Sequence, residues 1–310
     1  MDGDISAPIR RVLTALGSDD AVEVLAEQTG GSDLTSFLLE VMRRRAGRST
    51  PSDLMRQYRR DRFVEPGAVD ARALHRMTAT MIDSIPSSFK FVELAPVIPL
   101  GSHSVLAPVH QDKVVSGTRN LEVAADPTVA LAIVAAHARG DASAPTVHLA
   151  AVQRILRAQP FGTQGQPHFS VMALLSAGRD AGHLAFEAAA IGDHLRALVA
   201  AIAAVTGEPV EIRLTDLRAD DRPTITDAAH AALAPLRHVT VADDPGREAG
   251  RGYYRDLCFK VIVRPGPDEV EIGDGGFTDW TAQLLENRKE RLLTSGLGLD
   301  RLVTVASEPA

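Results

Sequence analysis

The sequence predicts an α+β protein in which helices flank a mostly antiparallel sheet and a helical segment precedes it. From about residue 5 to 84, apolar residues recur three and four positions apart, which is the helical period. After residue 85, short β-branched runs bounded by Gly, Pro or Asp alternate with helical patterns. Several of these runs follow one another directly, which favours an antiparallel sheet over a βαβ winding. We therefore expect an N-terminal helical segment at 1–84 and a core at 85–310.

Composition supports a folded chain and excludes several classes. The 310 residues are 45% apolar and 24% charged, which allows about two domains at roughly 150 residues each. The net charge of −7 argues against a dedicated non-specific nucleic-acid binder. No apolar run reaches the roughly 18 residues of a membrane span and no signal-peptide pattern opens the chain, so we expect a cytoplasmic protein without membrane contact. The single Cys258 cannot build a disulfide framework or a multi-thiolate zinc site.

Breaks in the apolar pattern divide the N-terminal segment into four or five short helices. Ser and Asp at the breaks are typical N-caps, and Pro51 indicates a further helix start. The helical patterns lie at 9–16, 21–28, 34–46 and 53–63. Eight arginines gather between residues 43 and 62. One interpretation is a binding patch for RNA, an acidic carrier or a protein partner. The other is ordinary solvated helix faces, which charge runs more commonly indicate.

The core alternates between strand and helix patterns. β-branched content and turn residues predict strands at 89–100, 113–118, 121–126, 146–161, 168–177, 209–216, 238–244, 257–265 and 269–276. Helical patterns lie at 127–140, 186–207, 226–236 and 278–293. The alanine-rich helix that begins at Phe186 is expected to pack against the sheet.

The end of the core carries a motif of known type. Residues 296–302 read Gly-Leu-Gly-Leu-Asp-Arg-Leu, a glycine-spaced turn into a helix with an arginine. This motif resembles the third signature motif of class II aminoacyl-tRNA synthetases. Residues 250–259 resemble the arginine, double-tyrosine and strand segment of the histidyl-tRNA synthetase branch, and 273–279 resemble its following glycine-rich turn. The order of these motifs strengthens the resemblance.

Upstream segments extend the resemblance over about residues 85 to 305. Residues 123–128 resemble the acidic segment that follows a strand in this branch, and 152–159 resemble its second motif. Pro96 resembles the proline of the first motif, through which these synthetases dimerise. The resemblance implies a homodimer that uses ATP and Mg²⁺ and takes an amino acid or related carboxylic acid.

Two arginines are the candidate catalytic residues. When ATP activates an acid, a carboxylate attacks the α-phosphorus, so the site must hold two anions together while charge builds on the phosphate. The guanidinium group suits this task because it is always charged and donates paired hydrogen bonds. By resemblance, Arg157 binds the α-phosphate and the substrate carboxylate, and Arg301 binds the γ-phosphate and covers the adenine. A lone arginine is more commonly a surface salt-bridge residue.

The resemblance also implies the other contacts. The expected ATP site adds Gln159, His168, Phe169 and Gly298, with Phe169 stacked on the adenine. The expected amino-acid site consists of Asp126, Thr128, Arg251, Tyr253, Tyr254, Gly275 and Gly276.

The residues themselves leave alternatives open at several of these positions. Asp126 precedes Pro127 and is a plausible N-cap as well as a partner for a substrate ammonium. Gly275 and Gly276 permit either close approach to a ligand or a strand-ending turn with positive φ. Tyr253 and Tyr254 alternate if they lie on a strand, so only one would face a pocket. Phe169 and His168 also fit ordinary core or surface positions, and Asp126, Glu187 and Asp274 are the open candidates for holding Mg²⁺.

Departures from the branch pattern bear on the substrate. Gln159 stands where the second motif carries glutamate, and Ala249 stands where the histidine-reading arginine is expected, so Arg247 or Arg251 would have to substitute. Phe277 and Thr278 replace a basic residue and a tyrosine. These changes argue against histidine as the substrate. The sequence stops a few residues after Arg301, where this branch continues into an anticodon-binding domain, so we expect neither standard tRNA charging nor full tRNA recognition.

Two functions follow from these observations. The retained Arg157 and Arg301 favour a stand-alone core that adenylates an amino acid or related acid. The replaced Gln159 and the altered histidine segment favour a non-catalytic amino-acid-binding or regulatory protein, similar to the regulatory subunit of ATP phosphoribosyltransferase. We expect the enzyme, because the third motif is the ATP-binding one.

Overall fold

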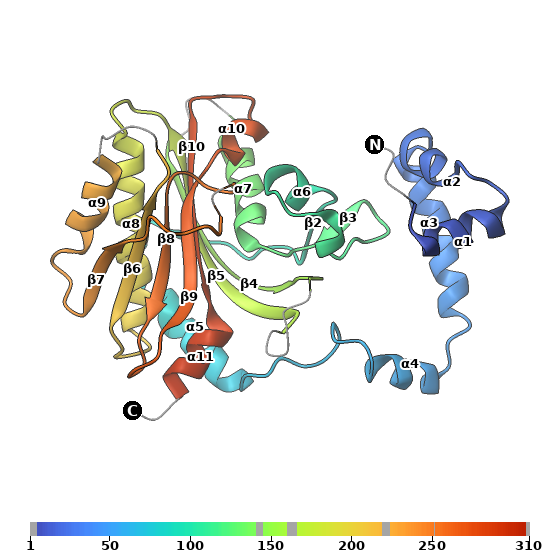
Figure 1. Cartoon of the computed structure of the whole chain (residues 1–310), viewed down its shortest axis with the longest axis horizontal. Coiled ribbons are helices and arrows are strands. Elements are labelled where there is room, and N and C mark those ends of the chain that lie inside the picture. The colour runs from blue at the N-terminus through green and yellow to red at the C-terminus, as the bar shows by residue number, and fades with distance from the viewer. Residues whose placement is uncertain (1–4, 141–144, 160–165, 219–223, 251, 308–310) are drawn as a thin grey trace.

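The computed structural model describes residues 5–140, 145–159, 166–218, 224–250 and 252–307, and its centre is one eight-stranded sheet (Figure 1). In spatial order the strands are β1 (Lys90–Phe91), β4 (Val147–Leu156), β5 (His168–Arg179), β10 (Glu290–Gly298), β9 (Val270–Thr278), β8 (Arg255–Val263), β6 (Val210–Asp216) and β7 (Val239–Asp243). The outer pairs β1–β4 and β6–β7 are parallel, and every other neighbouring pair is antiparallel. The predicted α+β class is confirmed.

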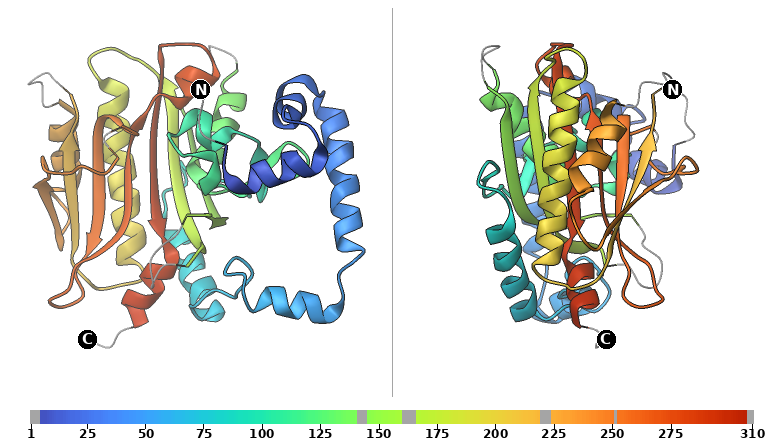
Figure 2. Two further views of the ribbon diagram at one scale, coloured as in Figure 1. Left: turned by 45° about the vertical axis from the view of Figure 1, so that its right-hand side comes forward. Right: turned by 90° about the vertical axis from the view of Figure 1, so that its left-hand side faces the viewer.

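Each face of the sheet is covered by one long, largely apolar helix. Helix α7 (Pro127–Ala138) packs on β4 and β5, and its apolar surface is buried nearly all round. Helix α8 (Ala185–Ala203) covers the opposite face beside α9 (Thr224–Leu233) (Figure 2). This is the packing expected for the alanine-rich helix, whose small side chains let it approach the strands closely.

The region between the first strands contains short elements. A separate pair of strands, β2 (Val97–Pro99) and β3 (Leu121–Val123), lies beside α6 (Ser102–Leu106) and the 3₁₀ turn η2 (Gln111–Lys113). The strand expected at 113–118 is wrong, because this segment contributes only a single bridge from Ser116 to Glu122.

The last part of the core differs most from expectation. The helix expected at 278–293 is wrong: α10 spans only Trp280–Leu284, and β10 begins at Glu290. Glu286 has φ of +49°, which interrupts the helix, and the following residues pair with both β5 and β9. Tertiary pairing at the centre of the sheet thus outweighs the local helical pattern. Helix α11 (Leu299–Ser307) follows directly, as the third motif predicts.

Helix α5 (Ala71–Ser84) packs against α8 and α11. Met81 on α5 is fully buried in the cluster that α8 forms with the sheet. The last helix of the expected N-terminal segment therefore contributes to the core, while the boundary at residue 84 stays a prediction.

The preceding helices form an arm that extends away from the sheet (Figures 1 and 2). The arm consists of α1 (Ala7–Leu16), α2 (Ala21–Glu23), the π-helical turn η1 (Val24–Gln28), α3 (Gly31–Ala46) and α4 (Pro51–Tyr58). Thr50 and Asp53 form a capping box at α4, as the Ser/Thr-Pro pattern predicts. Among the helices in the described ranges, none combines the length and the apolar character that a membrane span requires.

Candidate active site

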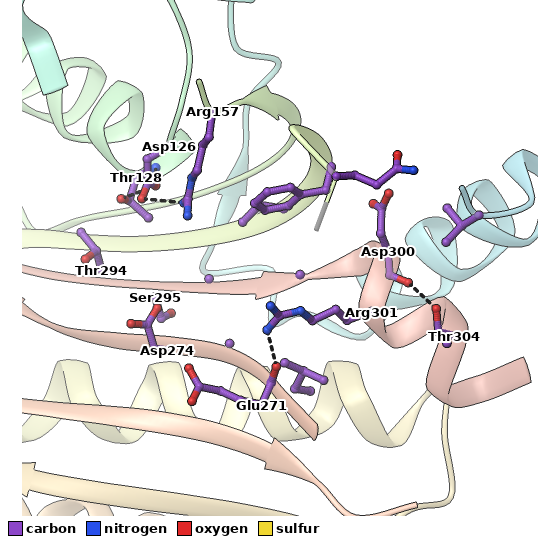
Figure 3. Close-up of a pocket in the computed structure, with 18 of the residues that line it drawn as sticks. Asp126, Thr128, Arg157, Glu271, Asp274, Thr294, Ser295, Asp300, Arg301 and Thr304 are labelled. Carbon is purple, nitrogen blue, oxygen red and sulfur yellow. Dashed lines mark hydrogen bonds and ion pairs between the residues drawn. The ribbon is translucent and has the colours of Figure 1, made fainter. Parts of the chain in front are cut away.

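A cavity of about 500 Å³ opens on the face of the sheet that carries α7 (Figure 3). Its lining comes from the first turn of α7, the residue after β4, the start of β5, the first half of β9, the second half of β10 and the start of α11. Asp126, Thr128, Thr294 and Asp274 lie toward one end, and Arg301 lies toward the other (Figure 3). The cavity is large enough for a small ligand.

Asp126 and Arg157 form the polar centre of the cavity. Asp126 is the N-cap of α7, and its Oδ1 accepts hydrogen bonds from the Thr128 backbone N–H at 2.9 Å and from its hydroxyl at 2.7 Å. The other carboxylate oxygen lies 3.6 Å from Nη2 of Arg157. Nε of Arg157 donates to the Ala125 carbonyl at 2.9 Å, which fixes the guanidinium at the helix start. Asp126 is therefore both the cap and an anion that faces the cavity, as the sequence allowed.

A buried pair behind α7 supports this arrangement. Nε2 of His103 accepts the backbone N–H groups of Ala125 and Asp126, each at 3.1 Å, so Nδ1 carries the proton that it shares with Glu122 at 2.6 Å. Burial acts to raise the pKa of the Glu122 carboxyl, but hydrogen bonds led by that from Gln111 outweigh burial and hold the pKa below its usual value. The sequence patterns did not reveal this positioning pair.

Phe169 lies beside the Arg157 guanidinium, with 5.3 Å between the guanidinium carbon and the ring centroid. Both residues line the cavity together with Gly298 and Arg301. Arg301 is exposed and donates from Nη1 to the Glu271 carbonyl at 2.7 Å. Arg157, Phe169 and Arg301, which come from two motifs some 130 residues apart, thus converge on one cavity.

Tyr253, Tyr254 and Asp274 lie together in the lining of the cavity. The tyrosines lie in a turn before β8 and not on a strand, so the expectation that only one faces the pocket is wrong: both line it. Tyr254 donates its hydroxyl to Asp274 Oδ2 at 3.1 Å, and Arg247 Nη2 lies 3.2 Å from the same oxygen. Burial raises the pKa of the Asp274 carboxyl, although the Arg247 charge acts to lower it. Of the two arginines that could substitute for the expected one, Arg247 thus contacts Asp274, and Arg251 lies outside the described residues.

Gly275 and Gly276 lie inside β9 and do not line the cavity. Neither has a positive φ, so the turn interpretation is wrong. A Cβ on Gly276 would lie 2.5 Å from the Tyr254 ring, and a Cβ on Gly275 would lie 2.5 Å from the ring of Phe259. The absence of side chains at these two positions lets the rings of Tyr254 and Phe259 contact the strand.

Two further predicted residues, His168 and Gln159, are not among those that line the cavity. Nε2 of His168 lies 2.6 Å from the Glu65 carbonyl, and Nδ1 accepts from Arg154. The backbone carbonyl of Gln159 accepts from Arg62 at 3.2 Å, so one of the clustered arginines anchors a core loop. Arg251 lies outside the described residues.

The residues around Arg301 suit a magnesium ion only when phosphate oxygens of a bound nucleotide supply the other ligands. Within the part of the chain that the structure describes, no three His, Cys, Asp or Glu side chains are placed to hold a metal. Nucleotide-bound Mg²⁺ needs just one or two carboxylates besides phosphate oxygens. Glu271 and Asp300 line the cavity beside Arg301 and supply such groups, whereas Glu187 lies in a different cavity.

Comparisons with known proteins bear on the fold. The sequence matches no protein-family model and no curated protein. A solved ATP phosphoribosyltransferase regulatory subunit/histidyl-tRNA synthetase from Bacillus halodurans matches with a TM-score of 0.61 and 14% identity, over 79% of this chain and 83% of that one. The apo histidyl-tRNA synthetase of S. aureus matches with a TM-score of 0.58 and 13% identity, over 76% of this chain and 65% of that one. The chain has the fold of a class II aminoacyl-tRNA synthetase core.

A third structure, a histidine–tRNA ligase subunit from Alicyclobacillus acidocaldarius, has the same core, with a TM-score of 0.57 and 12% identity over 78% of this chain and 95% of that one. The resemblance read from the motifs is thereby confirmed at the level of the class II synthetase-like core. The chain spans 65% of the length of the S. aureus enzyme.

Proposed function

We propose that the protein activates an amino acid or a related carboxylic acid with ATP in this cavity. The observation that carries the proposal is the convergence of Arg157, Phe169 and Arg301 with Asp126 and Asp274 in one cavity. A dipolar ligand fits this arrangement, since its ammonium group would face the two carboxylates and its carboxylate would face Arg157.

The chain's own residues then account for the reaction. Arg157 holds the substrate carboxylate against the α-phosphate of ATP and neutralises charge as the carboxylate oxygen attacks phosphorus. The new bond forms between that oxygen and the α-phosphorus, the bond to the pyrophosphate oxygen breaks, and pyrophosphate leaves. Arg301 binds the γ-phosphate, and Phe169 supplies a face for the adenine. Mg²⁺, when bound with ATP, would neutralise further phosphate charge beside Glu271 and Asp300.

Amino-acid-dependent exchange of pyrophosphate into ATP tests the proposal. A panel of amino acids should yield at least one that supports exchange, and Arg301→Ala or Arg157→Ala should lower kcat/KM about 100- to 1,000-fold, since each removes a charge that stabilises the transition state. Arg196→Ala is the matched control, because Arg196 is an exposed arginine on α8 that pairs only with Asp193 among the described residues. Exchange with no acid at all would reject the enzyme.

A second candidate is an amino-acid-binding regulatory protein that performs no chemistry. The position of Gln159 favours it, because this residue replaces the glutamate of the motif and does not line the cavity. Calorimetric binding of an amino acid, together with absent exchange, would select this function.

A further inference from the structure

A second cavity, of about 420 Å³, lies at the other end of β9 and β10 from the candidate active site. Thr278 at the end of β9 and Glu290 at the start of β10 contribute to its lining. The first cavity instead uses Glu271 to Asp274 of β9, and Thr294, Ser295, Gly296 and Gly298 of β10. The volume suits a molecule of amino-acid size. The two cavities have no lining residue in common.

Glu187 contributes a buried carboxylate to this second cavity, and only one of its two oxygens is hydrogen-bonded. The residue lies on the first turn of α8 and is 2% exposed. Its Oε1 accepts from Nε of Arg291 at 2.9 Å, while Oε2 has no hydrogen-bond partner among the described residues. Burying a charged oxygen without a hydrogen-bond donor costs free energy. Its position in the lining of a cavity therefore indicates that a ligand supplies the donor.

Asp256 adds a second carboxylate at an unusual backbone position. It has φ of +50° and lies at a register shift in β8, where a regular strand would give it an extended conformation. Burial raises the pKa of its carboxyl. A backbone kept in a strained conformation beside a cavity is typical of a functional position.

The arginines near Glu187 and Asp256 are shared with other carboxylates. Arg291 pairs with Glu187 and, at 2.7 Å, with Asp180, and its charge also acts on Asp256. Arg218, whose charge acts on Asp256 more strongly than that of Arg291, also pairs with Asp216. Arg255, a further residue of the lining, pairs with Asp279. At the cavity's exposed side, Arg288 has no side-chain partner within the ranges that the structure describes, so it is available to an anionic group.

We infer that this cavity binds a small zwitterion of the amino-acid type, with its primary ammonium between Glu187 and Asp256 and its carboxylate toward Arg288. An ammonium group donates three hydrogen bonds and so satisfies Oε2 of Glu187 directly. Thr278, whose buried Oγ1 also has no partner among the described residues, supplies a further polar atom in the lining.

Calorimetry in a background that disables the first cavity tests this site. The Asp126→Asn/Asp274→Asn protein is titrated with the twenty standard amino acids, ornithine and β-alanine, and each binder is compared with its N-acetylated form. We expect at least one free amine to bind and its acetylated form to bind at least 10-fold more weakly. Adding Glu187→Gln or Asp256→Asn should weaken the same ligand by about 10- to 100-fold, since each removes a charge from the ammonium site.

Asp193→Asn is the matched control, because it removes an exposed carboxylate from the same helix and should leave binding unchanged. Glu187→Gln retains an oxygen that accepts from Arg291, so its thermal unfolding should stay close to that of the background. The inference is overturned if no amine binds at millimolar concentration, or if binding persists in both Glu187→Gln and Asp256→Asn. Because exchange depends on the first cavity, these outcomes do not bear on the proposed activation reaction.

Discussion

At the scale of single residues, Asp126 has two separable roles. Its carboxylate caps α7 and also presents a charge to the cavity beside Arg157. Asparagine caps helices about as well as aspartate, but it carries no charge.

Substitutions of Asp126 should therefore separate stability from binding. We expect Asp126→Asn to leave the free energy of unfolding nearly unchanged and to weaken amino-acid binding about 10- to 150-fold, as loss of a charged hydrogen-bond partner implies. Asp126→Ala should additionally destabilise the protein by ~1 kcal/mol through loss of the cap. Urea unfolding and calorimetry measure the two effects. Equal binding by wild type and Asp126→Asn would remove this residue from the site.

Asp274 should make ligand binding depend on pH. Burial raises the pKa of its carboxyl in the folded protein above the ordinary 3.8. At pH values between the ordinary pKa and the raised pKa, the folded state binds more protons than the unfolded chain. The contribution of Asp274 to stability therefore falls as pH rises through this range. A bound ammonium favours the carboxylate, so the affinity for the amino acid should rise with pH across the same window. Calorimetry from pH 4 upward should show this rise in wild type and a flat profile in Asp274→Asn.

The residues that the sequence could indicate are those in recognisable motifs, such as Arg157, Phe169 and Arg301. Their roles in ATP and amino-acid binding stay predictions. His103 and Glu122 could not be found this way, because they contact each other and backbone groups of segments that are distant in sequence. Gln159 and His168 follow the motif in sequence, yet their contacts are to Arg62 and Glu65 in the connection to the arm.

At the scale of elements, β9 shapes the cavity through a residue that lacks a side chain. A Cβ on Gly276 would lie 2.5 Å from the Tyr254 ring and 2.8 Å from Cβ of Cys258. We expect Gly276→Ala to cost about 1–3 kcal/mol of stability by overpacking and to displace Tyr254 from the cavity. Gly207→Ala is the control, since no atom lies within 4 Å of its new Cβ. Thermal unfolding and ligand titration compare the pair, and an unperturbed Gly276→Ala would contradict the packing described.

Helix α8 is joined to the sheet by a buried polar contact. His194 accepts or donates at 2.9 Å to Ser176 on β5 and at 2.8 Å to Ser295 on β10. Burial, with a smaller contribution from His148, lowers the pKa of His194 from 6.5 to about 3. The unfolded chain therefore takes up a proton below pH 6.5 that the folded protein does not bind until about pH 3.

Stability should consequently fall as pH drops through this window, by up to about 1.4 kcal/mol per pH unit from this residue. When the free energy of unfolding, measured with urea at pH 4 to 7, is plotted against pH, its slope should be smaller in His194→Asn than in wild type. His110→Gln, which changes a histidine whose side chain is 73% exposed, should keep the wild-type slope. Identical slopes in all three proteins would show that His194 is not held neutral.

Local patterns predicted the elements whose stabilising contacts are local. The cap at Asp126 and the capping box at Thr50 mark the true starts of α7 and α4. Strand β10 was missed because Leu, Glu, Arg and Lys in residues 284–293 favour a helix in isolation. Only pairing with β5 and β9, more than a hundred residues away in the first case, makes this segment the central strand.

At the level of the whole molecule, the chain combines a class II synthetase-like core with an arm that exposes apolar side chains. Large apolar side chains are exposed throughout the arm, among them Val12, Leu16, Phe37, Leu54 and Met55. Residues 43–62 contribute eight arginines to a chain whose net charge is −7. The arm's partner and the homodimer stay predictions, and mass by light scattering would test the dimer against the 33.0 kDa of one chain.

If the protein activates an acid as proposed, the substrate carboxylate attacks the α-phosphorus of ATP. The most direct test of this step supplies the amino acid that supports exchange with ¹⁸O in its carboxylate, adds hydroxylamine as acceptor, and measures the mass of the AMP released. Attack by the carboxylate places one labelled oxygen on phosphorus, so we predict AMP heavier by about 2 Da. AMP without label, or no more AMP than Arg301→Ala releases, would show that the carboxylate does not attack the α-phosphorus.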